Sequence, residues 1–180
     1  MFVKDKFNHF VFREHYYPVA RYFYEEFKRD KSVILERSKT TNILMNYIDS
    51  SLSQETIITY IHRSIRNLKK YGMKERDNRF FYRKFRFEFM QPEIFLYALL
   101  VELNNLKFPR VSKDSMLSYM KTPRLFLVYE EELNEILQEL TKKNYISFVE
   151  QQTDNVIIFS GENIQSFAKE NKIKLINYRV

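Results

Sequence analysis

Lysine and arginine side chains between positions 63 and 86 are the residues of this sequence best placed to do chemistry. Ten of them lie there: Arg63, Arg66, Lys69, Lys70, Lys74, Arg76, Arg79, Arg83, Lys84 and Arg86. The same stretch holds two acidic residues, Glu75 and Asp77, and several aromatic rings. Cationic side chains displace the counterions condensed on phosphates, and aromatic rings stack on unpaired bases. The stretch predicts a nucleic-acid-binding surface. A solvated helix face, an acidic protein partner and an anionic membrane surface are the alternatives.

The charge of the chain is unevenly distributed. Its 180 residues have a formal net charge of +7. Residues 1–91 hold 19 Lys and Arg against 11 Asp and Glu, a net charge of +8, whereas residues 92–180 hold 11 against 12, a net charge of −1. The length suits one domain or two small ones. We therefore expect a basic, aromatic-rich helical domain over residues 1–90 and a second domain over residues 91–180.

The composition excludes most catalytic and metal-binding motifs. The chain has no cysteine, and its two glycines cannot build a P-loop or a dinucleotide-binding fingerprint. Among the three histidines, His9 and His15 lie six residues apart, a spacing that suits no helical or extended metal pair, and His62 is isolated. No serine lies in a Gly-x-Ser-x-Gly elbow. We expect a non-enzymatic protein with neither metal nor cofactor.

A helix over residues 54–71 is expected to position the first of the clustered cations. Ser53 can accept a hydrogen bond from the first turn, and Gly72 is expected to take the left-handed conformation that ends many helices. The apolar side chains on one side of this helix are Ile57, Ile58, Ile61, Ile65 and Leu68. Its basic side chains, from Arg63 onward, point the other way.

The elements around this helix predict a helix-turn-helix with a wing. Helices are expected over residues 33–37 and 40–48, and a turn at residues 76–79. A half-buried strand is expected over residues 81–89, where phenylalanines alternate with charged residues.

Residues 92–171 resemble a winged helix-turn-helix domain. The segments that carry the resemblance are the apolar helix Ile94–Leu103, the short helix Lys113–Met120, the helix Tyr129–Lys143, and the hairpin Ile146–Phe159 after the residues KKNYI. The resemblance implies a winged-helix fold in which Tyr129–Lys143 is the recognition helix in the major groove. A terminal helix over residues 162–171 and a short strand over residues 174–176 are expected to follow.

The outward side of the helix over residues 129–143 is acidic, which opposes that implication. Its glutamates are Glu131, Glu135 and Glu139, to which Glu130 and Glu132 add further negative charge. DNA phosphates would repel such a surface. We therefore expect the second domain to use its scaffold for protein contact or self-association, and the basic first half to bind nucleic acid.

The sequence thus predicts a mainly α protein with small β-hairpins, of the α+β class. Its first half is expected to be helix-turn-helix-like and its second half winged-helix-like. The expected function is duplex-DNA binding, by a regulator or an accessory subunit of a bacterial or phage mobile-element or antiphage system. We expect a cytoplasmic protein that does not enter a membrane, because neither a signal peptide nor a membrane-spanning apolar run is found. A protein-interaction scaffold and a binder of single-stranded RNA or DNA are the alternatives.

Overall fold

The structure is a computed structural model of the whole chain, and it describes residues 16–48, 51–84, 86–88, 90–107, 110–151, 154–159 and 162–173. The described part contains eight helices and two three-stranded antiparallel sheets. This content confirms the prediction of a mainly helical α+β protein. The short strand expected over residues 174–176 lies outside the described residues.

The chain forms two compact units. Among the described residues, the N-terminal unit comprises residues 16–90 together with residues 124–129, and the C-terminal unit comprises residues 91–123 and 130–173. Residues 124–129 are therefore a segment of the second half of the sequence that packs into the first unit.

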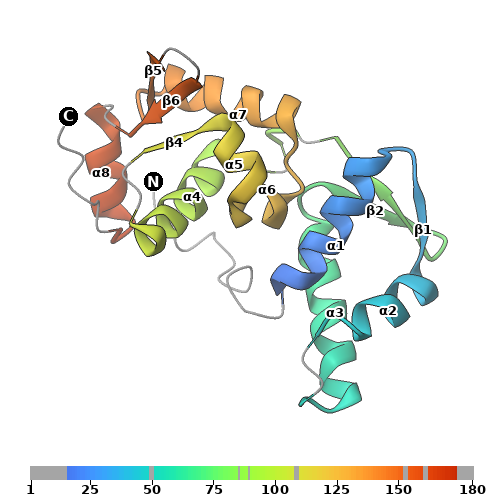
Figure 1. Ribbon diagram of the computed structural model, residues 1–180. Helices are drawn as coiled ribbons and strands as arrows, with labels where there is room; N and C mark the ends of the chain where they lie inside the picture. Colours follow the sequence, from blue (N-terminus) through green and yellow to red (C-terminus); the bar gives the residue numbers. More distant parts are fainter. Residues whose placement is uncertain are drawn as a thin grey trace. The chain divides into compact units, whose positions relative to one another are not determined.

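The N-terminal unit contains three helices and a small sheet (Figure 1). Its elements are α1 (Tyr16–Arg29), β1 (Ile34–Glu36), α2 (Arg37–Met45), α3 (Gln54–Leu68), β2 (Met73–Arg76) and β3 (Arg79–Tyr82). The strand order is β1-β3-β2, with both pairings antiparallel. The core is aromatic and aliphatic, and the ring of Phe23 on α1 meets the ring of Phe80 on β3 edge-on at 5.3 Å. Such large rings bury more apolar area per residue than aliphatic side chains do.

Residues 124–129 complete the core of the N-terminal unit, although they are distant from it in the sequence. The hydroxyl of Tyr16 donates a hydrogen bond to the carbonyl oxygen of Leu125 at 3.0 Å. The ring of Phe126 packs edge-on against that of Tyr71, with 4.8 Å between centres. The N-terminal fold thus depends on six residues that no local pattern in residues 1–90 could supply.

Two of the expected elements in the N-terminal unit are wrong. Residues 34–36, expected in a helix, form strand β1, because they pair with β3 over Ile34–Phe81 to Glu36–Arg79. Sheet pairing outweighs local propensity in so short a segment. The strand expected over residues 81–89 instead occupies Arg79–Tyr82, and residues 83–84 and 86–88 are not in a strand. Its partner β2 begins only at Met73, opposite Tyr82, so the hydrogen-bonded ladder ends there.

The C-terminal unit repeats the same order of elements. They are α4 (Pro92–Leu106), β4 (Arg110–Ser112), α5 (Lys113–Tyr119), α6 (Lys121–Phe126), α7 (Glu130–Lys142), β5 (Ser147–Gln151), β6 (Asp154–Ile158) and α8 (Glu162–Glu170). The strand order β4-β6-β5 matches that of the first sheet, with the first strand beside the last. α6 and α8 are additional helices, and the last residues of α6 belong to the N-terminal unit. The expected hairpin and the expected long helix are confirmed as β5–β6 and α7.

Candidate nucleic-acid interface

The helix that carries the first predicted cations is α3. The Ser53 hydroxyl oxygen accepts a hydrogen bond from the backbone N–H of Thr56 at 3.3 Å, so the expected N-cap is confirmed. Ile57, Ile61 and Leu68 are buried on the inner side of the helix. Because this apolar side of α3 is buried, the opposite side of the helix faces solvent.

A stripe of exposed side chains runs along the outer face of α3 and its last turn. Thr59, Arg63, Arg66 and Lys70 are all exposed. Their spacing of i, i+4, i+7 and i+11 places them on one helix face. Within the described part of the chain, none of the three cations forms an ion pair. Their charges are therefore available to an external anion.

The hairpin β2–β3 adds three cations on one face of the sheet. Its two-residue turn, Asp77–Asn78, has positive φ angles of 51° and 57°, as a tight hairpin turn requires. Side chains alternate across a strand, so Lys74, Arg76 and Arg79 share the face opposite the buried Phe80. All three are exposed. Arg76 lies 3.4 Å from the carboxylate of Asp77, but both side chains are more than four-fifths exposed, so this pair is weak.

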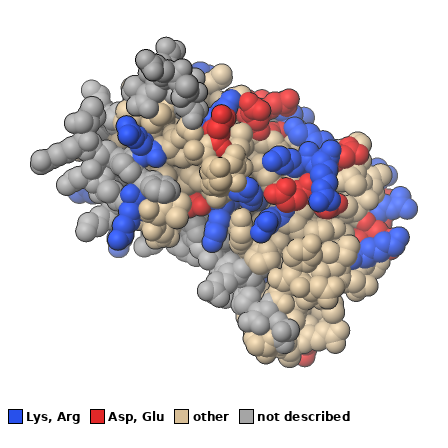
Figure 2. Space-filling view, viewed as in Figure 1, with Lys and Arg blue, Asp and Glu red and all other residues tan. Residues whose placement is uncertain are grey.

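On the face shown in Figure 2, charged side chains gather at the end of the N-terminal unit that holds the sheet. Lys and Arg atoms there are mixed with Asp and Glu atoms.

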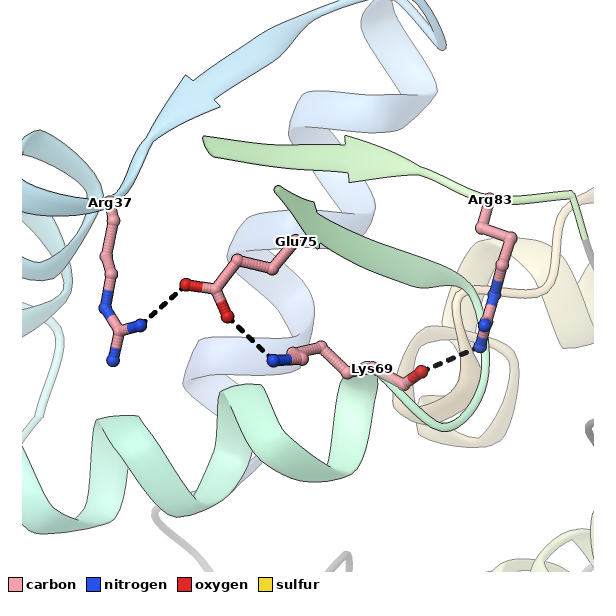
Figure 3. Close-up of polar contacts among 4 residues, drawn as sticks. All are labelled: Arg37, Lys69, Glu75 and Arg83. Carbon is pink, nitrogen blue, oxygen red and sulfur yellow. Dashed lines mark hydrogen bonds and ion pairs between the residues drawn. The ribbon is translucent and has the colours of Figure 1, made fainter. Parts of the chain in front are cut away.

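Glu75 is the acid that joins the hairpin to two helices (Figure 3). Its carboxylate accepts hydrogen bonds from Arg37 Nη1 at 2.6 Å and from Lys69 Nζ at 2.7 Å. Arg37 begins α2, and Lys69 caps the end of α3. Burial by itself would raise the pKa of the Glu75 carboxyl, but the bond from Lys69 and the charge of Arg37 outweigh it and lower the pKa. The carboxylate thus fixes the hairpin relative to α3.

Arg83 also has a structural position. Its Nη2 donates hydrogen bonds to the carbonyl oxygens of Lys69 at 2.7 Å and Tyr71 at 3.0 Å (Figure 3). A cation at the end of a helix satisfies carbonyls that have no partner within the helix, and it complements the helix dipole. Of the ten predicted cations, Lys69 and Arg83 are therefore held by the fold. Lys84 and Arg86 follow β3 and are exposed.

The aromatic rings in this stretch mostly serve the core. Phe80 is fully buried, and Tyr82 packs against Phe27 with ring centres 5.9 Å apart. Phe81 lies on the outer face, with Lys74 Nζ 5.7 Å from its ring centre. Phe85 lies outside the described residues. The described rings therefore do not form a row on which several bases could stack.

The acidic surface predicted on α7 is smaller than expected. Glu131 is exposed and Glu135 is half-exposed. Glu139 pairs with Lys142 at 2.5 Å. Glu132, expected on this surface, is fully buried on the inner side of α7. The outer face of α7 nevertheless remains acidic. In the N-terminal unit, the helix that directly precedes the hairpin is α3, and its outer face is basic.

Sequence reasoning missed Arg37 and the role of Glu75. These side chains meet across 38 residues, and no local spacing signals such a contact. Thr59 could have been found, because it lies four residues before Arg63 on the same helix face.

Comparisons with protein-family models, with curated proteins and with solved structures gave no match. No helix in the described ranges is both long enough and apolar enough to cross a bilayer. Among the same residues, no group of three or more histidine, cysteine or acidic side chains is arranged to hold a metal ion.

Proposed function

We propose that the N-terminal unit binds duplex DNA, with the outer face of α3 in the major groove and the β2–β3 hairpin against neighbouring phosphates. The observation that carries this proposal is the exposed stripe of Arg63, Arg66 and Lys70, which has no acidic partner among the described residues. Arginine is the side chain most often bonded to guanine in the major groove, and lysine neutralises phosphates.

The order of elements supports the same reading. A helix, a strand, two helices and a hairpin, with the first strand beside the last, resemble a winged helix-turn-helix domain. In such domains the second helix of the motif enters the major groove. The corresponding helix here is α3, and the hairpin takes the place of the wing.

The C-terminal unit is proposed to contact protein rather than DNA. It has the same order of elements, but its α7 presents Glu131 and Glu135 where the N-terminal unit presents arginines. Negative charge at this position repels phosphate and suits a basic protein surface. We therefore assign DNA binding to the N-terminal unit and protein binding to the C-terminal unit.

We infer a non-enzymatic regulator or accessory subunit, of bacterial or phage origin and acting in the cytoplasm, within a mobile-element or antiphage system. Single-stranded RNA or DNA is the less favoured ligand. Phe80 is buried and Tyr82 packs against other rings, so few faces remain for stacking unpaired bases.

The test is the affinity of the full chain for a labelled duplex of mixed sequence, measured by fluorescence anisotropy over a range of salt concentrations. We expect the logarithm of the binding constant to fall linearly with the logarithm of salt, with a slope of about 0.9 per phosphate contact. The double variant Arg63→Ala/Arg66→Ala is expected to bind roughly 10- to 100-fold more weakly.

The matched control removes two exposed lysines from the other unit, in Lys169→Ala/Lys172→Ala. It makes the same change in net charge and is expected to bind within about twofold of the parent, apart from the small effect of net charge. Equal losses in the two double variants would show only a general charge effect and would contradict the α3 interface. Tighter binding to a single strand than to the duplex would favour the alternative ligand.

A further inference from the structure

A pocket with a volume of about 520 Å³ lies beside strand β4 in the C-terminal unit. It is formed by residues of α4, β4, β6 and α5 together with the residue that follows α5. The apolar residues in its wall are Leu106, Val111, Met120 and Val156. Sites for small organic ligands have volumes of roughly 300–1,000 Å³ and mostly apolar walls. The pocket therefore has the size and the lining of a small-molecule site.

Tyr119, the last residue of α5, is the aromatic residue of this pocket. It is 84% exposed, and its ring packs against no other ring within the described part of the chain. Leu106, the last residue of α4, borders the same pocket and is 46% exposed. Large apolar side chains exposed together around a cavity are typical of a binding surface. A ligand with an aromatic ring would stack on the exposed ring of Tyr119.

Arg110 supplies the charge of the pocket. It is exposed on β4, and it is the one charged side chain among the described residues that line the cavity. No carboxylate pairs with it in the described ranges of the chain, whereas the neighbouring Lys113 bonds Glu130 at 3.0 Å. The guanidinium group is thus available to an anion. Its planar fork of N–H donors matches the two oxygens of a carboxylate.

The other polar side chains of the pocket are two serines, whose hydroxyl groups are used by the fold. Ser112 Oγ accepts a hydrogen bond from the Ser115 N–H at 3.1 Å, as the N-cap of α5, and donates one to Ser115 Oγ at 3.0 Å. A sugar or a nucleotide needs many hydrogen-bond partners, and a phosphate monoester carries up to two negative charges. One arginine beside apolar walls suits a ligand with an apolar body and a single negative charge.

We propose that this pocket binds a small aromatic carboxylate. Its ring stacks on Tyr119 and lies against Met120, and its carboxylate accepts hydrogen bonds from Arg110. Burial of the ring supplies most of the affinity, because a solvent-exposed ion pair contributes little by itself. The arginine selects acids over neutral molecules of the same shape. This proposal does not depend on DNA binding by the N-terminal unit.

The first experiment measures binding to the full chain by equilibrium dialysis. The probes are naphthoate and phenylbutyrate, each compared with its neutral amide, which has nearly the same shape and no charge. We expect both acids to bind with dissociation constants on the order of 100 µM, and the amides to bind roughly 5- to 10-fold more weakly. No binding of either acid at millimolar concentration, or equal affinities for acids and amides, overturns the proposal.

Two substitutions test the assigned roles in the same assay. Arg110→Gln should abolish the preference for the acids and leave the affinity for the amides unchanged, whereas Tyr119→Ala should weaken acids and amides alike by roughly 5-fold. The matched controls, Arg76→Gln and Tyr47→Ala, change exposed residues of the N-terminal unit and should leave all affinities within about twofold of the parent. Losses in the controls equal to those in the pocket variants overturn the proposal.

The second experiment locates the ligand by NMR of isotope-labelled methionine methyl groups. Met120 lies in the wall of the pocket, and Met73 is buried in the N-terminal unit. The ring current of bound naphthoate should shift the Met120 signal, assigned through Met120→Leu, and leave the Met73 signal unchanged. A shift of Met73 alone, or of neither signal, overturns the proposal. A short peptide with glutamate on both sides of phenylalanine that binds more tightly than both acids and displaces naphthoate would assign the pocket to protein contact and overturn it likewise.

Discussion

Gly72 lies directly against Leu127, so closely that a Cβ atom at position 72 would be 2.7 Å from the Leu127 Cβ. The carbonyl oxygens of Phe126 and Leu127 are each 3.2 Å from the same point. The sequence favoured a different role for this glycine, as the left-handed residue that ends a helix. That interpretation is wrong, because Gly72 has no positive φ and α3 ends at Leu68. The glycine is needed because the segment of residues 124–129 passes over it.

We expect Gly72→Ala to lower the free energy of unfolding by about 1–3 kcal/mol, as overpacking of a tight core does. The atoms nearest the added methyl group are the Leu127 Cβ and two backbone carbonyl oxygens, and rotating a side chain moves none of them. Urea denaturation measures the change, with Lys70→Ala as a nearby exposed control. An unchanged denaturation midpoint for Gly72→Ala would show that residues 124–129 do not pack on Gly72.

Glu75→Gln is expected to lower stability at pH 7 by about 1–2 kcal/mol, since it removes the charge that holds Arg37 and Lys69. The folded-state pKa of Glu75 is lowered. Its contribution to stability is therefore present above the ordinary carboxyl pKa and is lost as pH falls through the folded-state value. Urea midpoints measured from pH 7 down to pH 3 should fall less steeply for Glu75→Gln than for the parent. Glu88→Gln, at an exposed position, should follow the parent curve.

Tyr71 should make the protein sensitive to alkali. Burial raises its pKa to about 12, above the value of 10.0 for an exposed tyrosine. The unfolded chain thus releases this proton at lower pH than the folded chain does, and stability falls as pH rises from about 10 to 12. The loss attributable to Tyr71 is roughly 2 kcal/mol at pH 12. Tyr71→Phe should lessen this loss in denaturation curves recorded at pH 8 and pH 11.5, and parallel curves for parent and variant would contradict the assignment.

Substitutions at Arg83 and Arg63 are expected to have different effects: loss of Arg83 should lower stability, whereas loss of Arg63 should weaken DNA binding. Arg83→Ala removes two hydrogen bonds to the carbonyls at the end of α3 and should cost about 1–2 kcal/mol of stability. Arg63→Ala alters an exposed residue and should change stability by less than about 0.5 kcal/mol. Thermal denaturation and duplex affinity, measured on both variants, provide the check. A loss of affinity in Arg63→Ala that follows a loss of stability would remove it from the interface.

The sequence alone determined the elements whose signals are local. α3 followed from the Ser53 cap and the repeat of isoleucines, and α7 and the β5–β6 hairpin followed from periodicity and turn residues. These features depend on interactions between residues close together in the chain, so they can be predicted from the sequence. The concentration of cations between positions 63 and 86 is likewise a property of the sequence.

Only the tertiary structure decided which of those cations serve the fold. Lys69 is held by Glu75, and Arg83 is held by carbonyl groups at the end of α3, whereas Arg63 and Arg66 face solvent. It also decided that residues 34–36 form a strand, since β1 exists only through its pairing with β3. The same holds for residues 124–129, which complete a core that begins about a hundred residues earlier. Such contacts depend on side chains far apart in the chain, and no periodicity in either segment encodes them.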